Sequence, residues 1–545
     1  MRIGIFLGYG PQVHLGTEGL GRYIGGLIKG FAQENTDTTI AVPKWLRPSL
    51  DNLFNELDVP KASIKYISNK RESLVWIIYK KLVLEKTDKK NLFVSLIQRV
   101  LMTLLLLGVR ASIKIPVVLF VLACILVVIG AIALLPVIVI LGLISLVAQK
   151  IMGKLKLKTG HLVRGFIVPE NDTLFLDVYY EMTNSVIELL IKKINEDQQT
   201  DIWYVPSLFW PQVNKIKRPL VINAPDLVTA EYPVAFAAAT GMSQQAEQVK
   251  ATVYGGKYFI TYCEFIRRTL LIRDFGKDPD NVVAIRHINN TSKPQIAIDP
   301  ARGQRINSRV EPELELCHKL INELVSKSAP AYYTQQMHLE NVHYLFYASQ
   351  IRPHKNVLNL IKAVEYLIHE KNVPIKLFLT GFFCKDIPSE ISEYVFQKRL
   401  EHDVISFNNV PTQTLAALYR CADMVVNPSM YEGGFAFTFG EGMSVGTPSV
   451  LANIPFEMDV LGPAGLEDVT FDPTDWHDIA DKIEYWLPRR EELYQKELPL
   501  YEELAKRTPD VVAKEYIKTF EYFIDKSRAD KEMEARKTEA GKTIG

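Results

Sequence analysis

NPSMYEGGFAFTFGEGMSVGTPSV, residues 427–450, places two carboxylates, Glu432 and Glu441, around an apolar loop that contains Gly433 and Gly434. Glycine lets the backbone come close to a ligand because it carries no Cβ atom. The residues around Glu441 are predicted to begin a helix, whose free N–H groups and dipole attract a phosphate. The apolar segments on both sides are predicted to be strands. This strand–loop–helix–strand order is how open α/β sheets build ligand sites at their carboxyl edge.

The segment resembles the nucleotide-sugar signature of the family-4 (group 1) retaining glycosyltransferases of GT-B fold. Their pattern is Glu-Gly-Phe-Gly, then Glu-Ala-Met, then Gly-x-Pro-Val. One departure is that eight residues separate the two glutamates here, where the family usually has seven. The matching positions are Glu432, Gly434, Phe435, Glu441, Met443, Gly446 and Pro448.

The resemblance implies that this segment holds the sugar-nucleotide donor. Glu432 would accept hydrogen bonds from hydroxyl groups of the donor sugar, and Glu441 from the ribose. The amides of Gly433 and Gly434 would face the departing diphosphate, and Phe435 belongs to the same donor-binding loop. These roles are carried over from the family's motif, residue by residue.

A second segment, residues 349–356, is similar to the family's Gly-Arg-Leu-x-x-x-Lys-Gly/Asn, which supplies an Arg and a Lys to the donor diphosphate. Lys355 matches the Lys. Gln350 stands where the Arg is usual, and Arg352 follows two residues later. Breaking the anomeric C–O bond develops negative charge on the diphosphate, so positive charge is needed there. We therefore predict Lys355, Arg352 and Glu432 as the catalytic residues.

The N-terminal half carries weaker parts of the same resemblance. Gly19 and Gly21 match the family's Gly-Gly-x-Gly-Arg-Tyr loop, which approaches the donor sugar and its phosphates. Asp226 matches the family's His-Asp segment, with Pro225 where the histidine is usual. Gly19 and Gly21 are therefore predicted to contact the donor.

Apolar and helical segments alternate through both parts of the chain, and this βαβ pattern implies parallel sheets. Residues 174–179 are predicted as a strand and 182–194 as the helix after it. We predict an α/β protein of GT-B fold, with two doubly wound Rossmann-like domains facing a central cleft. The predicted boundaries are 1–335 for the N-terminal acceptor domain, interrupted by a membrane-associated helical insertion at 70–160, then 336–515 for the C-terminal donor domain and 516–545 for a helix and charged tail.

Residues 115–148 carry no charge, which predicts a membrane segment. As one straight helix these 34 residues would span roughly 50 Å, against a hydrocarbon core of roughly 30 Å. Gly130 and Pro136 lie near the middle, and basic residues flank both ends, which favours the cytoplasm for both. We predict a hairpin or re-entrant element within 93–148 that attaches the chain to the cytoplasmic face of the cell membrane.

The 545-residue chain has a formal net charge of +1, which gives no field to recruit nucleic acid. Its five dispersed cysteines fit a reducing compartment, and the histidines show no metal-binding spacing. We predict a retaining hexosyltransferase of polysaccharide biosynthesis that needs no metal or other cofactor. Its partners would be a GDP- or UDP-sugar, with GDP-mannose favoured, a lipid-linked or glycan acceptor, and membrane lipids. A non-catalytic scaffold of the same fold, or an epimerase or phosphorylase, stays open as an alternative.

Overall fold

The computed structural model describes residues 1–17, 19–69, 74–80, 102–103, 106, 174–232, 242–297, 312–328, 341–381 and 390–543. Within this part of the chain, no helix is both long enough and apolar enough to cross a membrane. The predicted insertion at 70–160, with its apolar run at 115–148, lies outside the described residues except for 74–80, 102–103 and 106. The membrane segment therefore stays a prediction.

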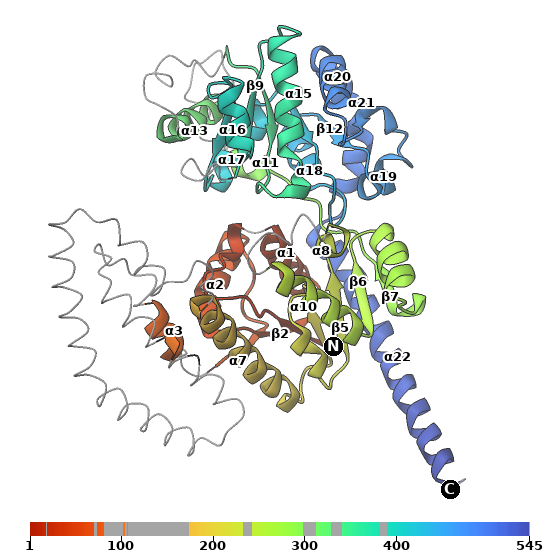
Figure 1. The fold of residues 1–545 in the computed structure, drawn as a ribbon. Helices are drawn as coiled ribbons and strands as arrows, with labels where there is room; N and C mark the ends of the chain where they lie inside the picture. Colours follow the sequence, from red (N-terminus) through yellow and green to blue (C-terminus); the bar gives the residue numbers. More distant parts are fainter. Residues whose placement is uncertain are drawn as a thin grey trace, which may run out of the picture.

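The first half of the chain forms a seven-stranded parallel sheet in the order β3-β2-β1-β4-β5-β6-β7 (Figure 1). Most of its strand residues are buried, as expected for a parallel sheet covered on both faces. The strands are β1 (Arg2–Phe6), β2 (Asp37–Ala41), β3 (Ile64–Ile67), β4 (Ile202–Val205), β5 (Leu220–Ala224), β6 (Tyr258–Thr261) and β7 (Val282–Ala284). The longer helices of this half are α1 (Gly19–Gln33), α2 (Arg47–Glu56), α7 (Leu174–Glu196) and α10 (Met242–Gly255).

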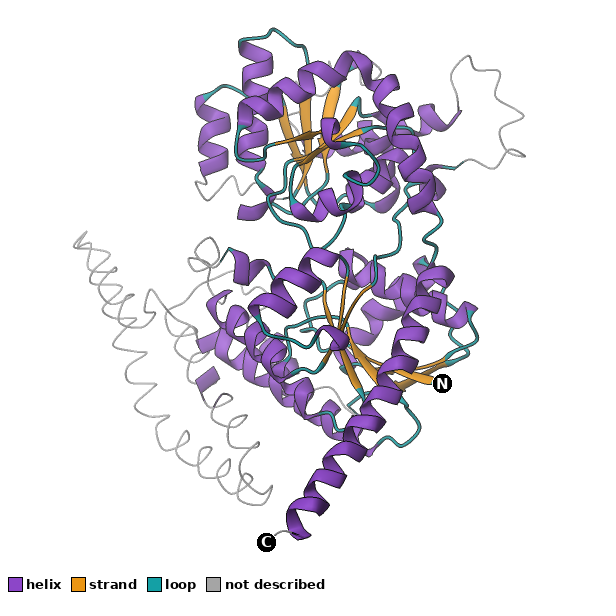
Figure 2. Cartoon of the chain, turned by 90° about the vertical axis from the view of Figure 1, so that its right-hand side faces the viewer, coloured by secondary structure: helices purple, strands orange, loops and turns teal. Residues whose placement is uncertain are grey.

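The second half repeats this plan with a six-stranded parallel sheet in the order β10-β9-β8-β11-β12-β13. Its strands are β8 (Tyr344–Tyr347), β9 (Lys376–Thr380), β10 (Val404–Phe407), β11 (Met424–Asn427), β12 (Ser449–Ala452) and β13 (Thr470–Phe471). Its helices include α13 (Pro312–Ser328), α15 (Val357–His369), α16 (Glu390–Gln397), α17 (Thr412–Cys421), α18 (Phe437–Met443), α19 (Pro455–Leu461), α20 (Trp476–Trp486) and α21 (Arg490–Ala505). Figure 2 shows helices on both faces of each sheet. The fold is α/β with two parallel sheets, as the sequence predicts.

The last helix, α22 (Pro509–Thr543), returns from the second half to the first and packs against α1 (Figure 1). The contact is close, because a Cβ atom on Gly30 would lie 2.1 Å from the carbonyl oxygen of Pro509. The buried hydroxyl of Tyr23 in α1 also donates to that of Tyr516 over 2.9 Å. The chain therefore passes between the halves a second time at the start of α22, which fixes its last helix to the first half.

The predicted strand at 174–179 is wrong. These residues form the first turns of α7, a continuous helix from Leu174 to Glu196. Its buried residues include Val178, Met182, Val186 and Leu190, four apart, which is the spacing of a helix face turned to a core. The segment LFLDVYY, residues 174–180, has the composition of a strand. Its buried residue Val178, however, has the helical spacing of the buried residues that follow it in α7.

Candidate functional site

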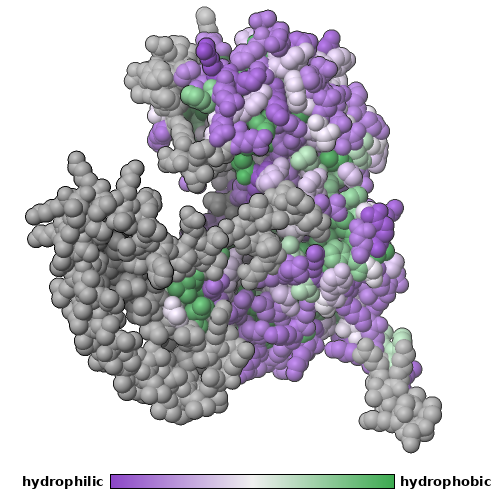
Figure 3. Space-filling view, viewed as in Figure 1, coloured by the Kyte–Doolittle hydropathy of each residue, from purple (hydrophilic) through white to green (hydrophobic). Residues whose placement is uncertain are grey.

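The loops at the carboxyl edges of the two sheets contact one another. The Tyr431 hydroxyl, after β11, accepts a hydrogen bond from the backbone N–H of Leu227, after β5, over 2.7 Å. A Cβ atom on Gly433 would lie 2.1 Å from the carbonyl oxygen of Pro225. Only glycine fits such an approach, so the glycine loop is built against the first half. Figure 3 shows a mostly hydrophilic surface on both halves, with hydrophobic residues gathered at the junction between them.

Lys355 and Glu432 form an ion pair at this junction. The Lys355 Nζ atom donates to Glu432 Oε1 over 2.6 Å, and each side chain is only 18% exposed. Lys355 ends a short 3-10 helix and is followed by Asn356, which has a left-handed φ of 54°. The Asn356 amide donates to the carbonyl oxygens of Pro428 and Pro473 over 3.0 and 2.6 Å. The loop that carries Lys355 is thereby fixed to the segment that carries Glu432.

Arg352 lies on the same loop, but its side chain is exposed. Its guanidinium donates to Oε1 of the Gln350 side-chain amide over 2.5 Å, so the residue at the usual Arg position holds the side chain of Arg352. Burial raises the pKa of Asp226 in the first half, while the charges of Arg352 and Lys355 lower it. The positive charges of Arg352 and Lys355 therefore both act on the carboxyl group of Asp226. The structure supports its nearness to the site and leaves its catalytic role a prediction.

Glu441 lies on α18 and is held by two side chains. The Tyr419 hydroxyl donates to Glu441 Oε2 over 2.7 Å, and the Asn290 amide donates to Oε1 over 3.2 Å. Burial raises the pKa of the Glu441 carboxyl, while these hydrogen bonds and the charge of Arg22 lower it. A carboxylate oxygen can accept more than one hydrogen bond, so both oxygens keep capacity for ribose hydroxyls.

The two N-terminal glycines differ in what they do. Apart from its chain neighbours and its own helix backbone, no described residue has an atom within 4 Å of a Cβ placed on Gly19, so the described structure leaves space at the start of α1. A Cβ on Gly21 would lie 2.1 Å from the carbonyl oxygen of Leu15. Gly21 is therefore required for packing within its own half. Arg22 beside it donates to the Thr412 hydroxyl over 3.3 Å, which brings this loop against the second half.

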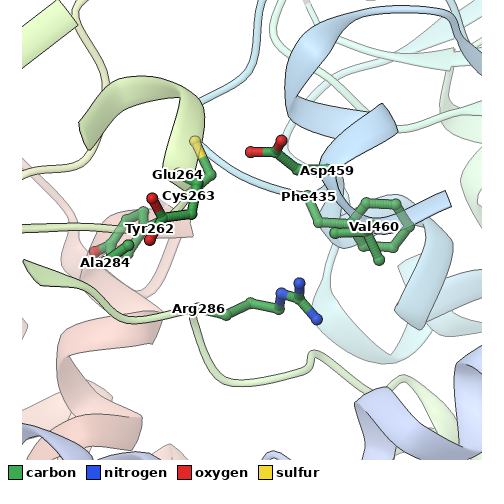
Figure 4. A pocket seen from close by; sticks show the side chains of 8 residues that line it. All are labelled: Tyr262, Cys263, Glu264, Ala284, Arg286, Phe435, Asp459 and Val460. Carbon is green, nitrogen blue, oxygen red and sulfur yellow. The ribbon is translucent and has the colours of Figure 1, made fainter. Parts of the chain in front are cut away.

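Phe435 lines a cavity of about 210 Å³ between the halves (Figure 4). The wall from the first half includes Arg286, and the wall from the second includes Asp459 of α19. The Asp459 carboxylate accepts from the backbone N–H of Phe265 over 3.1 Å, which ties α19 to the first half. The cavity is lined by Tyr262, Cys263, Glu264, Ala284, Arg286, Phe435, Asp459 and Val460. Phe435 thus contributes a wall beside the glycine loop.

Sequence reasoning missed several residues that hold the site. Tyr419 and Asn290 lie far from Glu441 along the chain, and no local pattern marks them as its partners. Glu457 gives a faint signal, since it is acidic in the first turn of α19. Its side chain is 1% exposed and accepts from the backbone N–H of Ala436 over 3.3 Å. His287, which is 7% exposed, contacts the same loop from the first half.

Among the described residues, no three His, Cys, Asp or Glu side chains come together as a metal site. The prediction that no metal is needed is not tested by this, and it stays a prediction.

Residues 334–499 match the family model described as glycosyl transferases group 1. O-antigen chain mannosyltransferase B of Escherichia coli is 31% identical over 141 residues, which are 26% of this chain and 35% of that protein. An uncharacterized glycosyltransferase of Methanocaldococcus jannaschii is 28% identical over 117 residues, which are 22% of this chain and 29% of that protein. The chain thus spans about a third of the length of these curated relatives.

Among solved structures, Anabaena HepE in complex with UDP-glucose superposes with a TM-score of 0.53. The superposition covers 96% of this chain and 99% of that chain at 12% sequence identity. At this identity the likeness shows the fold. Together with the family match over residues 334–499, it supports a transferase, as the sequence predicts.

Proposed function

We propose that this chain is a retaining glycosyltransferase that moves a hexose from a nucleotide sugar to a lipid-linked or polysaccharide acceptor. The observation that carries the proposal is the Lys355–Glu432 pair, held at 2.6 Å beside the glycine loop. It places a cation and a carboxylate where the carboxyl edges of the two sheets meet, within the segment that matches the group 1 family. Open α/β folds bind their ligands at this edge.

Lys355 would stabilise the diphosphate as it leaves, because negative charge grows there as the anomeric C–O bond breaks. Glu432 would hold hydroxyls of the donor sugar, and Glu441 would hold the ribose. The acceptor oxygen would bond to the anomeric carbon on the same face, and its proton would pass to the departing phosphate. This course needs no covalent nucleophile from the chain, and it fits a site in which Glu432 is already paired with a lysine.

Two likenesses support the choice of donor and acceptor. Anabaena HepE is described in complex with UDP-glucose, which supports a nucleotide-sugar donor. The Escherichia coli relative is described as an O-antigen chain mannosyltransferase, which supports mannose from GDP-mannose and a surface polysaccharide as product. The uncharged run at 115–148 supports attachment to the cytoplasmic face of the cell membrane, where a lipid-linked acceptor would be met.

The function is tested with the full chain in detergent or lipid nanodiscs. UDP-glucose, UDP-galactose, GDP-mannose and the free nucleotides are screened for thermal stabilisation, since a bound donor raises the unfolding midpoint by mass action. The donor that binds is then incubated with a membrane extract, and nucleotide release and transfer of labelled sugar are measured. Transfer with retained anomeric configuration is expected. Donor binding without any turnover would support the scaffold alternative instead.

Membrane attachment is tested by labelling single cysteines placed near Asp88 and Thr159 in sealed vesicles. Both positions are expected to react from the cytoplasmic side, because both catalytic halves would lie there. Labelling of the two positions from opposite sides would mean an odd number of crossings and would overturn the hairpin.

A further inference from the structure

One peptide group of the glycine loop is held from both halves of the molecule. The group joins Phe435 to Ala436, directly before α18. Its carbonyl oxygen, on Phe435, lies 2.7 Å from His287 Nε2 and accepts from it in the Nε2–H tautomer, whereas Nδ1 lies 3.0 Å from the Ile288 carbonyl oxygen, the longer of the ring's two carbonyl contacts. Its N–H, on Ala436, donates to Glu457 Oε2 over 3.3 Å. The two contacts act on opposite ends of one planar unit, so together they set its orientation.

His287 is packed so that its ring has little freedom. The ring centroid lies 4.2 Å from that of Phe437, which follows the held peptide. A Cβ atom on Gly434 would lie 3.3 Å from His287 Cδ2 and 2.9 Å from Tyr262 Cβ. The ring therefore touches residues on both sides of the peptide. At 7% exposure, no bulk water is at hand to replace its bond to Phe435.

The backbone of His287 is fixed at the point where the chain crosses between the halves. Arg507, between α21 and α22, donates to the carbonyl oxygens of Arg286 and His287 over 2.5 and 3.4 Å. Its guanidinium also pairs with Glu515 at 2.9 Å. Arg507 thus links the segment that contains Arg286 and His287 to the start of α22. From this linked segment the His287 ring reaches the glycine loop.

Glu457 holds the other end from within the second half. Its side chain is buried in α19, and within the described residues its second oxygen, Oε1, has no hydrogen-bond partner. Burial raises the pKa of this carboxyl well above its usual range, and the nearby charge of Glu432 raises it further. A neutral carboxyl still accepts from an N–H, so the bond to Ala436 does not require a charge.

We propose that His287 and Glu457 are positioning residues of the donor site, which hold the Phe435–Ala436 peptide from opposite halves. On this reading, the packing of the two halves against each other also orders the glycine loop. The amides of Gly433 and Gly434 then reach their ligand-binding positions only when His287 is in place. The inference rests on the proposed function, because it assigns these residues to the binding of a nucleotide-sugar donor.

The first test compares two changes at His287. His287→Leu keeps apolar bulk but leaves the buried Phe435 carbonyl without a donor. His287→Gln places an amide N–H near the position of Nε2. We expect His287→Leu to weaken UDP or GDP binding roughly tenfold or more and to lower kcat, since a buried unpaired carbonyl is costly. His287→Gln should restore both to within about threefold of the unchanged protein.

The second test uses Glu457. Because the bond needs only an acceptor, Glu457→Gln should bind nucleotide nearly as well as the unchanged protein, whereas Glu457→Met should resemble His287→Leu. The double variant should lose less than the product of the two single effects, since both bonds act on one peptide. Thr252→Val is the matched control. It removes the hydrogen bond from a buried hydroxyl to the Gln248 carbonyl oxygen within α10, away from the loop, and should leave nucleotide binding unchanged.

Hydrogen exchange of the amides at 433–440 reports the loop without reference to activity. We expect faster exchange in His287→Leu and Glu457→Met, and not in Thr252→Val. Equal nucleotide binding in His287→Leu and His287→Gln, or strictly multiplicative losses in the double variant, would overturn the inference. If His287→Leu fails to fold, His287→Asn replaces it, because its side chain is too short to reach Phe435. An unchanged protein that binds neither UDP nor GDP would contradict the proposed function instead.

Discussion

Lys355→Ala should reduce catalysis far more than it reduces stability. Removing one preorganised electrostatic donor costs about 10²–10³ in kcat in other enzymes, and Lys355 is proposed to act as the diphosphate leaves. The loss in folding free energy is smaller. Exposed ion pairs contribute about 0–1 kcal/mol, and breaking a fully buried pair costs about 3–5 kcal/mol. At 18% exposure of both side chains, we expect a loss of about 1–3 kcal/mol.

The double variant Lys355→Ala, Glu432→Ala separates the two effects. Without its lysine, Glu432 is an unpaired, mostly buried carboxylate, and removing it should recover part of the stability but none of the turnover. Lys371→Ala is the matched control. This lysine pairs with Glu484 at 2.8 Å in the same half, but both side chains are more exposed.

The assay measures kcat and KM from release of the nucleotide, and stability from the urea unfolding midpoint. Turnover of Lys355→Ala within threefold of the unchanged protein would refute the assignment of Lys355 to the leaving diphosphate. The same loss of turnover in Lys371→Ala would show that the measurement reports stability alone.

Glu441→Ala should weaken donor binding by about 1.5–3 kcal/mol, because ribose hydroxyls lose a charged acceptor; isothermal titration checks this, and unchanged affinity would remove Glu441 from the site. Gly433→Ala should abolish donor binding with a folded core retained, because its Cβ would lie 2.1 Å from the Pro225 carbonyl; circular dichroism and titration together test it, and normal binding would contradict it. Burial, with the charges of Arg286 and Arg507, lowers the pKa of His287, so its neutral form is favoured on folding. Stability should therefore fall as the pH drops below about 6.5, and His287→Gln should flatten that part of the unfolding profile; parallel profiles would contradict the assignment.

Much of the fold can be predicted from the sequence because its signals are local. Strands such as β1 and β11 are short apolar runs that end in turns, and the loop with Glu432 and Glu441 matches a spaced motif. The prediction is wrong at the start of α7, where composition is ambiguous. There a run with the composition of a strand forms the first turns of a longer helix. That both sheets are parallel follows from the alternation of strands and helices, whereas the order of strands within each sheet comes from the structure.

The support of the site cannot be predicted in this way, because its contacts join distant residues. His287 contacts Phe435 across 148 positions in the sequence, and Asn290 contacts Glu441 across 151. Neither residue lies in a motif, and each acts only once the two halves are packed together. The motif marks Lys355 in the sequence, but its pairing with Glu432 follows from the fold of two separate loops.

Two carboxyl groups besides Glu432 lie close to the glycine loop. Asp226 lies beside Gly433 and Glu457 accepts from the N–H of Ala436, and burial raises the pKa of each one. Each shift favours the neutral form, which reduces repulsion of an anionic ligand. Glu432 is compensated by Lys355. The raised pKa values of Asp226 and Glu457 and the pairing of Glu432 with Lys355 therefore lower the negative charge that an incoming diphosphate would meet, in a loop where Gln350 stands in place of the family's usual arginine.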